Sequence, residues 1–368
     1  MENKRVLLYG YYGNSNLGDD LILDTMLSIL NCFQISVNIN NVDVLNSMTT
    51  NHADIEGIGT NPYHFCSEIP HYRALVIGGG GLCPHRGVRQ PLVYLLFTLI
   101  AKLYRKKVIF FSIGITGEQT ALSLFIWKKI IWLSDLFVVR DKAFTKHLSG
   151  KNRKKVLEAY DIVFSRSTDA PAAIAPKIVA IAPANIVGLQ NNENYDIELA
   201  DVFTEFINRI MEKGYDVELL SFRKTADEAL CRAIAARVGQ DRCTYLDYPA
   251  TCQMAFSSFR RYYAVIGMRF HSLVLSAKNG IPFVPISYSH KSDELSEETG
   301  FIKLNLKYCI DARQYYRKII RFTADELADR FVALETNYEF YSQTIAKRSE
   351  EIVKITAESI RRLQLALN

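Results

Sequence analysis

The sequence predicts an α/β protein made of two doubly wound halves that face a cleft, followed by a helical tail. Three observations support this prediction. Apolar runs typical of buried parallel strands alternate with helical patterns along both halves. Between the halves, residues 166–176 are rich in Ala and Pro and show no periodicity, which is typical of a linker. At 368 residues, the chain is also too long for a single ordinary core.

The two halves show the same alternation of elements. Strands are expected in the first half at residues 5–9, 37–45, 74–78, 108–114 and 136–139, with helices beginning at Asp19, Pro91, Ala121 and Asp141. In the second half, strands are expected at residues 178–182, 216–222, near 245, 263–266 and 283–286, with helices at 195–212, 227–238 and after 251. We therefore expect domains over residues 1–168 and 177–322, and helices over 323–368 that pack back on the first domain.

Composition excludes several functional classes. Hydrophobic residues make up 49% of the chain and charged residues 23%, which is typical of a globular protein. The net charge of +5 is mild, and the basic residues are scattered apart from KNRKK at 151–155 and RKK at 105–107. These runs favour a solvated charged face, with weak attraction to an anionic membrane as the alternative, so no nucleic acid partner is expected. Seven cysteines without a CxxC pair indicate reduced thiols in a cytosol, and the histidines show no metal-site spacing, so we predict no metal. The amino end shows no signal-peptide pattern, and a cytoplasmic location is expected.

The most apolar window covers residues 91–104 and ends in the basic run RKK. It is shorter than a membrane span. A buried helix is the favoured interpretation, and a helix lying on a membrane surface is the alternative. Trp127 and Trp132, beside Lys128 and Lys129, are compatible with either interpretation.

Residues 9–20, YGYYGNSNLGDD, connect the first predicted strand to the first helix. Their glycines fit neither the dinucleotide fingerprint nor the phosphate loop. Asp19 and Asp20 stand at a helix start, where the helix dipole favours carboxylates, so a helix cap is one interpretation. The alternative is that Asn16, Asp19 and Asp20 accept hydrogen bonds from sugar hydroxyls, since two acidic groups would repel a phosphate.

Three further features follow predicted strands of the first half. VIGGGGLC contains Gly79, Gly80 and Gly81, and SIGITG begins with Ser112. Consecutive glycines let a backbone approach a ligand closely because no Cβ intervenes, so we expect these turns to line a site. Arg140 follows the next strand, and its guanidinium suits a carboxylate or a phosphate, although an ordinary surface arginine is the alternative.

The most informative stretch is residues 265–291, VIGMRFHSLVLSAKNGIPFVPISYSHK. Arg269 and His271 follow one apolar strand, and Lys291 follows the next. Ligands of open α/β sheets bind outside the carboxyl ends of the strands, where helix N-termini favour anions. Three cationic or protonatable groups would repel each other unless an anion neutralises them, so we expect a small, multiply charged anion here. For His271 alone, a histidine satisfied within the core is the alternative.

The chain resembles the polysaccharide pyruvyl transferase family up to about Gly300. The resemblance rests on the segments GYYGNSNLGDDLI, VIGGGGL, SIGITG, VVRDKAF and GMRFHSLVLSAKNGIPFVPISYSHK. It implies two Rossmann-like domains arranged as in GT-B glycosyltransferases. It also implies transfer of pyruvate from phosphoenolpyruvate to two hydroxyls of one sugar residue, which gives a cyclic ketal and releases phosphate. The chain departs from the family at Asp19-Asp20, where Asp-Glu is usual, and at His290, where Pro is common.

Carried over by position, the resemblance places the family's important basic residues at Arg140, His271 and Lys291. We assign His271 as general acid or base, Lys291 and Arg140 as the clamp on phosphate and carboxylate, and Arg269 as a second anion contact. Asp20 or Asp19 would orient the acceptor hydroxyl. Further substrate contacts are expected from Asn16, Gly79, Gly80, Gly81, Ser112, Ser287 and Tyr288. No metal or cofactor is required beyond phosphoenolpyruvate as donor.

The resemblance places the acceptor on the first domain and phosphoenolpyruvate on the second. The acceptor is a sugar of a bacterial surface polysaccharide or of its lipid-linked precursor, such as one on polyprenyl pyrophosphate at the inner face of the membrane. One alternative is a GT-B glycosyltransferase that uses a sugar nucleotide, for which the second half offers no convincing base-recognition element. The other is a non-catalytic anion-binding component of polysaccharide assembly.

Overall fold

The computed structural model describes residues 4–39, 55–82, 87–115, 119–166, 177–186, 195–239, 241–310, 319–320 and 322–368. The chain divides into two compact units. The first unit comprises Met1–Asn14, Asp19–Arg166 and Ile352–Asn368, and the second comprises Ser15–Gly18 and Ser167–Glu351. The predicted linker lies, beyond Arg166, outside the described residues.

The first unit is built on a parallel sheet of seven strands in the order β3-β2-β1-β4-β5-β6-β7. This doubly wound order reverses between β1 and β4, so the loops that follow these two strands diverge and leave room for a site at their carboxyl ends. The strands are β1 (Arg5–Tyr9), β2 (Gln34–Val37), β3 (Ile55–Gly57), β4 (Ala74–Gly78), β5 (Lys107–Ile113), β6 (Leu136–Val139) and β7 (Val156–Glu158).

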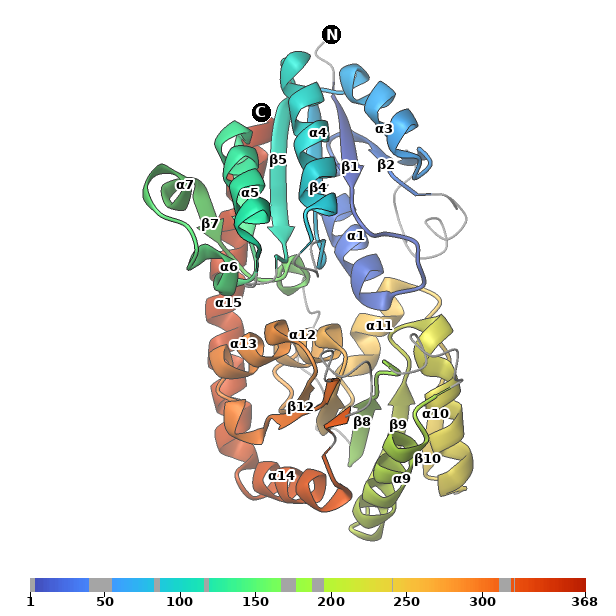
Figure 1. Cartoon of the computed structure of the whole chain (residues 1–368). Coiled ribbons are helices and arrows are strands. Elements are labelled where there is room, and N and C mark those ends of the chain that lie inside the picture. The colour runs from blue at the N-terminus through green and yellow to red at the C-terminus, as the bar shows by residue number, and fades with distance from the viewer. Residues whose placement is uncertain are drawn as a thin grey trace. The chain divides into compact units, whose positions relative to one another are not determined.

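Helices cover both faces of this sheet. Figure 1 shows α4 and α5 over one face and the carboxyl end of α15 behind the other. Tyr94, Phe97 and Trp127 of α4 and α5 are buried against the sheet. The helices of the unit are α1 (Leu17–Ile29), α3 (Pro62–Glu68), η1 (Ile69–His71), α4 (Arg89–Leu103), α5 (Ala121–Leu133), α6 (Lys142–Thr145), α7 (Gly150–Lys155), η2 (Ile162–Ser165) and the last residues of α15 (Tyr338–Leu367).

The second unit is a parallel sheet of six strands in the order β10-β9-β8-β11-β12-β13, with a two-stranded antiparallel pair, β14-β15. The order reverses between β8 and β11. The strands are β8 (Ile178–Ala182), β9 (Asp216–Leu220), β10 (Cys243–Leu246), β11 (Ala264–Gly267), β12 (Phe283–Ser287), β13 (Leu306–Lys307), β14 (Cys309–Ile310) and β15 (Ile319–Ile320). The helices are α9 (Ile197–Glu212), α10 (Lys224–Val238), α11 (Cys252–Phe259), α12 (Phe270–Lys278), α13 (His290–Glu298), η3 (Ile302–Leu304), α14 (Ala324–Thr336) and the first part of α15.

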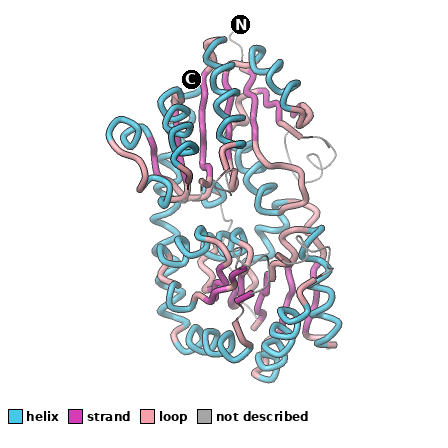
Figure 2. Tube along the Cα trace, viewed as in Figure 1, coloured by secondary structure: helices cyan, strands magenta, loops and turns pink. Residues whose placement is uncertain are grey.

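The predicted fold class is confirmed, because both sheets are parallel, helices flank them, and the chain ends in helices (Figure 2). Helix starts agree best where a cap sets them. Thr120 and Thr251 accept hydrogen bonds from the backbone N–H groups of Ser123 and Met254, each at 3.1 Å. Of the strand expected at residues 37–45, Val37 is the last residue of β2, and residues 40–45 lie outside the described residues.

The predicted tail contributes to both units. Tyr338, at the start of α15, stacks on Tyr263 of the second unit with ring centroids 4.2 Å apart. At the other end, Arg73 of the first unit donates a hydrogen bond to the Asn368 carbonyl at 2.8 Å. Among the described helices, none is both long and apolar enough to cross a bilayer.

Candidate active site

The loop after β1 sends a short segment into the second unit. Ser15–Gly18 groups with that unit. Leu17 donates a backbone hydrogen bond to the Phe222 carbonyl at 2.9 Å, and Asn16 forms an isolated antiparallel bridge with Arg223. The candidate residue Asn16 therefore lies just beyond the carboxyl end of β9.

Asp227 of α10 holds Arg269, the candidate anion contact that follows β11. Nε and Nη2 of Arg269 donate to the two carboxylate oxygens of Asp227 at 2.8 and 2.5 Å. Nη1 of Arg269 donates to the Tyr288 hydroxyl at 3.4 Å. Asp227 is fully buried and also accepts from the backbone N–H groups of Asn185 and Arg223. Burial acts to lower the pKa of Arg269, but Tyr288 and Asp227 outweigh it and raise the pKa, so the guanidinium stays charged.

This pair changes the charge argument made from the sequence. Three cationic groups were expected to require an external anion, yet Asp227 already matches the charge of Arg269. Charge balance alone therefore no longer requires a multiply charged anion. Sequence reasoning missed Asp227, although its place in the first turn of the helix after β9 puts it at the same edge of the sheet.

His271 and Lys291 both lie against the ring of Phe270. His271 is buried in the first turn of α12, and its ring centroid is 5.3 Å from that of Phe270. Lys291 is half-buried in the first turn of α13, and its Nζ is 5.1 Å from the Phe270 centroid. The next histidine, His290, is exposed, and its Nδ1 is 4.0 Å from Glu294. The structure thus brings His271 and Lys291 together at the ends of β11 and β12.

Two glycines allow this close arrangement. A Cβ on Gly18 would lie 1.9 Å from Nδ1 of His271, so the loop can pass the imidazole only without a side chain. A Cβ on Gly267 would lie 2.5 Å from both Ser272 and Leu273, so α12 can begin directly after β11. Ser287, also predicted as a contact, donates its hydroxyl to Asn305 at 2.7 Å.

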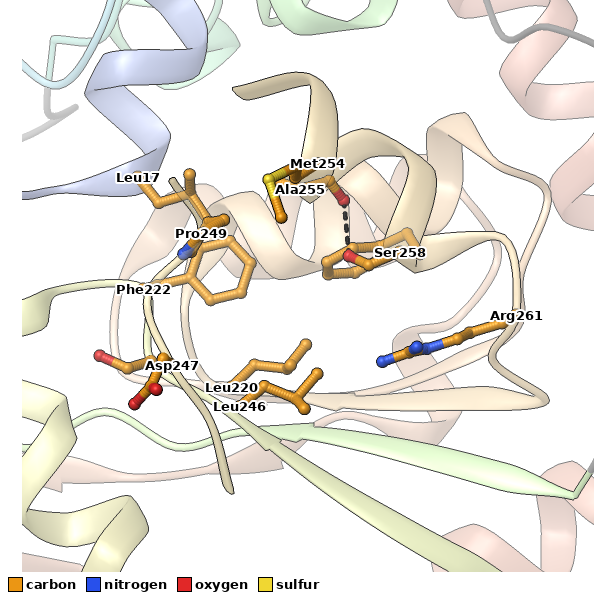
Figure 3. A pocket seen from close by; sticks show the side chains of 12 residues that line it. Leu17, Leu220, Phe222, Leu246, Asp247, Pro249, Met254, Ala255, Ser258 and Arg261 are labelled. Atoms are coloured by element: carbon orange, nitrogen blue, oxygen red, sulfur yellow. Dashed lines mark hydrogen bonds between the residues drawn. The ribbon is translucent and has the colours of Figure 1, made fainter. Parts of the chain in front are cut away.

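An apolar pocket of about 290 Å³ opens in the second unit beyond the ends of β9 and β10 (Figure 3). Two short segments join the pocket to the residues around His271 and Arg269. Leu17 precedes Gly18, which lies against His271, and Phe222 precedes Arg223, whose N–H donates to Asp227. The lining residues are Leu17, Leu220, Ser221, Phe222, Leu246, Asp247, Pro249, Met254, Ala255, Ser258, Phe259 and Arg261.

The charges at this pocket are matched within the protein. Asp247 forms an ion pair with Arg232 at 3.1 Å. Arg261 forms an ion pair with Glu218. The pocket therefore suits an uncharged, apolar or flat group.

Carboxylates surround Arg140 in the first unit. Its Nη1 donates to Asp161, and its Nε is 3.8 Å from an oxygen of Asp141. Burial acts to lower the pKa of Arg140, but Asp161, Asp141 and Asp19 raise it above the ordinary arginine value. Sequence reasoning missed Asp161, which follows β7 and begins η2. The arginine lies where it was predicted, but its charge is matched by this acidic surrounding.

The glycine turns fit around Arg140 and Asp19. A Cβ on Gly114 would lie 3.0 Å from Nε of Arg140, and one on Gly81 would lie 3.8 Å from its Nη2. Gly80 has a φ of +84°, and its Cβ would lie 2.8 Å from Oδ1 of Asp19. A Cβ on Gly79 would lie 1.9 Å from Ile22. Close contacts with protein side chains therefore account for Gly79, Gly80 and Gly114, whereas a Cβ on Gly81 would make only an ordinary contact.

The remaining candidates of the first unit are held by backbone contacts. Asp20 is buried and accepts from the Gly13 N–H at 3.2 Å. Ser112 has a φ of +51° and donates to the Tyr160 carbonyl at 3.2 Å. Asp19 is also buried, so the acidic pair is fixed in the first turn of α1.

Each unit therefore presents a different chemistry. The first offers one arginine among carboxylates, which suits hydroxyl groups, and the second offers His271 and Lys291 beside a matched arginine, which suits an anion. Within the described ranges, no three His, Cys, Asp or Glu side chains are grouped so as to hold a metal ion.

Solved structures with this fold include two glycosyltransferases and an epimerase. UDP-GlcNAc 2-epimerase from Neisseria meningitidis bound to UDP-GlcNAc matches with a TM-score of 0.56 and 8% identity, over 98% of this chain and 99% of that one. Arabidopsis thaliana UGT89C1 complexed with UDP matches with a TM-score of 0.60 and 10% identity, over 99% of each chain. Phytolacca americana UGT2, complexed with UDP-2-fluoro-glucose and pterostilbene, matches with a TM-score of 0.55 and 13% identity, over 97% and 99%. These similarities show the GT-B fold.

Sequence comparison identifies the family. No protein with a curated description matches the chain. The family model of polysaccharide pyruvyl transferase matches residues 16–290, well over half of the chain. The match covers Arg140, Arg269 and His271, and it stops one residue before Lys291. The chain therefore belongs to the polysaccharide pyruvyl transferase family.

Proposed function

We propose that the protein transfers pyruvate from phosphoenolpyruvate to two hydroxyls of one sugar residue of a bacterial surface polysaccharide or its lipid-linked precursor. The products are a cyclic ketal and phosphate. The observation that supports this best is the group formed by Arg269, His271 and Lys291 at the ends of β11 and β12 in a chain of this family. The proposed reaction uses no metal ion or cofactor.

The second unit supplies the proposed anion site. The N-termini of α12 and α13 lie at the same edge of the sheet, where the helix dipole favours phosphate or carboxylate. Lys291 adds a positive charge, and Arg269 is fixed in orientation by Asp227. Because fixed donors need no reorganisation when charge develops, such a site stabilises the departing phosphate.

His271 is the proposed proton-transfer group. The methylene carbon of phosphoenolpyruvate gains a proton while the first sugar hydroxyl attacks the adjacent carbon. The second hydroxyl then attacks that carbon, and the bond to phosphate oxygen breaks. Each of the two hydroxyls loses one proton. One proton ends on the carbon that becomes the methyl group, and the other ends on the released phosphate. An imidazole is suited to moving such protons near neutral pH.

The first unit supplies the proposed acceptor contacts. Asp19 and Asp20 are acceptors for sugar hydroxyls, and Asp20 is proposed to orient the attacking hydroxyl. Arg140 lies among carboxylates, so we propose that it orders the acidic group and contributes less to phosphate binding than Lys291 does. A carboxylate-rich surface favours neutral hydroxyls over a second anion.

The test is phosphate release from phosphoenolpyruvate with a panel of lipid-linked and aryl-linked sugars that differ at the 4- and 6-hydroxyls. We expect release to depend on the acceptor, with one phosphate per ketal formed, and to persist in the presence of a chelator. Absence of release with every acceptor in the panel would contradict the proposal. A requirement for an added metal ion would contradict the proposed mechanism.

Sugar-nucleotide glycosyl transfer is the second candidate, and the apolar pocket favours it. The pocket is lined by Phe222 and Phe259 and adjoins the anion site, so it has room for a flat base while phosphates lie near α12. The Neisseria and Arabidopsis proteins of similar fold are bound to UDP-GlcNAc and UDP. Thermal shift separates the candidates: we expect phosphoenolpyruvate to raise Tm and UDP-sugars to leave it unchanged, and the reverse result favours the second candidate.

A further inference from the structure

Helix α4 exposes a stripe of leucines on the first unit. Leu92, Leu96, Leu99 and Leu103 recur at alternating spacings of four and three, so they share one side of the helix, and Leu103 is 78% exposed. The opposite side, including Tyr94 and Phe97, is buried. The interpretation of this window as a buried helix therefore holds for one side only.

Helix α5 extends this apolar surface, because it packs beside α4 (Figure 1). Its exposed residues Leu122, Phe125 and Trp132 also recur at helical spacing, and Trp132 is 64% exposed. Trp127, the other tryptophan considered from the sequence, is fully buried. The seven exposed residues of α4 and α5 are called the apolar face below: Leu92, Leu96, Leu99, Leu103, Leu122, Phe125 and Trp132.

Basic residues border the apolar face. Lys129 lies over the ring of Phe125 at 5.3 Å from its centroid. Helix α7 packs against α5, and Nζ of its Lys155 donates a hydrogen bond to the Trp132 carbonyl at 2.6 Å. The exposed or half-buried cations of this border are Lys102, Arg105, Lys106, Lys128, Lys129, Lys151, Arg153, Lys154 and Lys155.

The sequences of α4, α5 and α7 contain no acidic residue. Two acids lie on adjoining described segments, and each is paired with a cation of the border: Asp135 with Lys102, and Glu158 with Arg153. The cations outnumber these two acids, so the border keeps a net positive charge.

We propose that the apolar face docks on the surface of an anionic phospholipid bilayer. Aliphatic and tryptophan side chains would enter the interfacial region, and the bordering lysines and arginines would meet the lipid phosphates. Charge distinguishes this partner from a second copy of the chain. A symmetric dimer would place the same net positive border against itself, and the like charges would repel. An anionic membrane instead offers phosphates to the cations that Asp135 and Glu158 do not pair with.

The test is flotation of the full-length chain with vesicles. We expect binding to vesicles of phosphatidylcholine with phosphatidylglycerol to be at least about tenfold tighter than to phosphatidylcholine alone, and to weaken at high salt. The double variant Leu103→Gln, Trp132→Gln should lose about tenfold or more of this binding while Tm and phosphate release with a soluble acceptor stay unchanged. Both side chains are largely exposed, so the variant should fold normally.

Two matched variants complete the test. Tyr63→Gln changes an aromatic side chain of α3 that is 87% exposed and lies outside the apolar face, and it should leave vesicle binding unchanged. The variant Lys128→Gln, Lys129→Gln, Lys154→Gln should remove most of the preference for anionic vesicles. The proposal is overturned if the chain binds no vesicles, or if the leucine and tryptophan variant binds as the wild type does. It is also overturned if the apolar face instead forms a dimer that this variant dissociates.

Discussion

Two arginines, one in each unit, are each paired with a buried carboxylate but differ in their other neighbours. Arg140 follows β6 and pairs with Asp161, and Arg269 follows β11 and pairs with Asp227. Around Arg140 the further charged groups are Asp141 and Asp19. Arg269 instead stands at the start of α12, which carries His271 in its first turn, and Lys291 lies in the first turn of α13. An arginine matched by a carboxylate contributes little net charge, so the neighbours decide whether the site prefers hydroxyls or anions.

The comparison also separates orientation from charge. In both pairs a buried carboxylate fixes the guanidinium, and the carboxylates raise the arginine pKa in spite of burial. Removing one partner of such a pair leaves an uncompensated buried charge. The predictions below test which neighbours carry the chemistry and which only hold the pair.

The largest effect is expected at His271. His271→Ala should lower the turnover of phosphoenolpyruvate by about 10² to 10⁴, because a positioned proton-transfer group is lost. His290→Ala is the matched control, since His290 follows β12 at the same edge of the sheet but is exposed, and it should keep near-wild-type turnover. The measurement is acceptor-dependent phosphate release. Comparable turnover in wild type and His271→Ala would remove His271 from the mechanism.

The next effect concerns the stability of the second unit's pair. Asp227→Asn should lower the free energy of unfolding by about 3 to 5 kcal/mol, because Arg269, whose side chain is only 15% exposed, is left without its carboxylate. Asp325→Asn, which alters the exposed partner of Arg209, should change it far less. In the first unit, Asp161→Asn should lower it less than Asp227→Asn does, because Asp141 and Asp19 still surround Arg140.

Urea unfolding of the three variants measures these differences. If Asp161→Asn and Asp227→Asn destabilise equally, the extra carboxylates around Arg140 do not compensate for the lost partner. That result would remove the energetic difference between the two units.

A smaller effect is expected at Gly18. Gly18→Ala places a methyl group on the imidazole of His271, and displacement of that ring should lower turnover by about 10². Gly87→Ala is the control, because a Cβ there has no neighbour within 4 Å. Turnover of Gly18→Ala equal to that of Gly87→Ala would show that the position of His271 against the loop is not important for the reaction.

The fold was predictable from the sequence because its strands are continuous apolar runs. β4 and β8 are buried over almost their whole length and carry the residues expected of parallel strands. β3, β7 and β13 were missed because strands of two or three residues are too short to show an apolar run or an alternation of apolar and polar residues. Their pairing depends on neighbouring strands, which one segment does not reveal.

The basic residues of the site were predictable because they follow strand ends in sequence. Asp161 and Asp227 were missed because each meets its arginine only through folding, across separations of 21 and 42 positions. The contact between Gly18 and His271 was missed for the same reason. Sequence position predicts which edge of a sheet a residue occupies, but it does not predict which charge faces it there.

The smallest effect is expected at Gly80 in the first unit. Gly80→Ala should destabilise the chain by roughly 1 to 2 kcal/mol, because its backbone is left-handed. Gly214→Ala is the matched control: its φ of +90° is close to the +84° of Gly80, but its Cβ would meet no neighbour within 4 Å. Only Gly80→Ala presses on Asp19, so only that variant should raise the KM for the sugar acceptor, while the KM for phosphoenolpyruvate stays unchanged. An equal rise in both KM values would show that Asp19 does not act on the acceptor alone, and would remove the assignment of hydroxyl binding to the first unit.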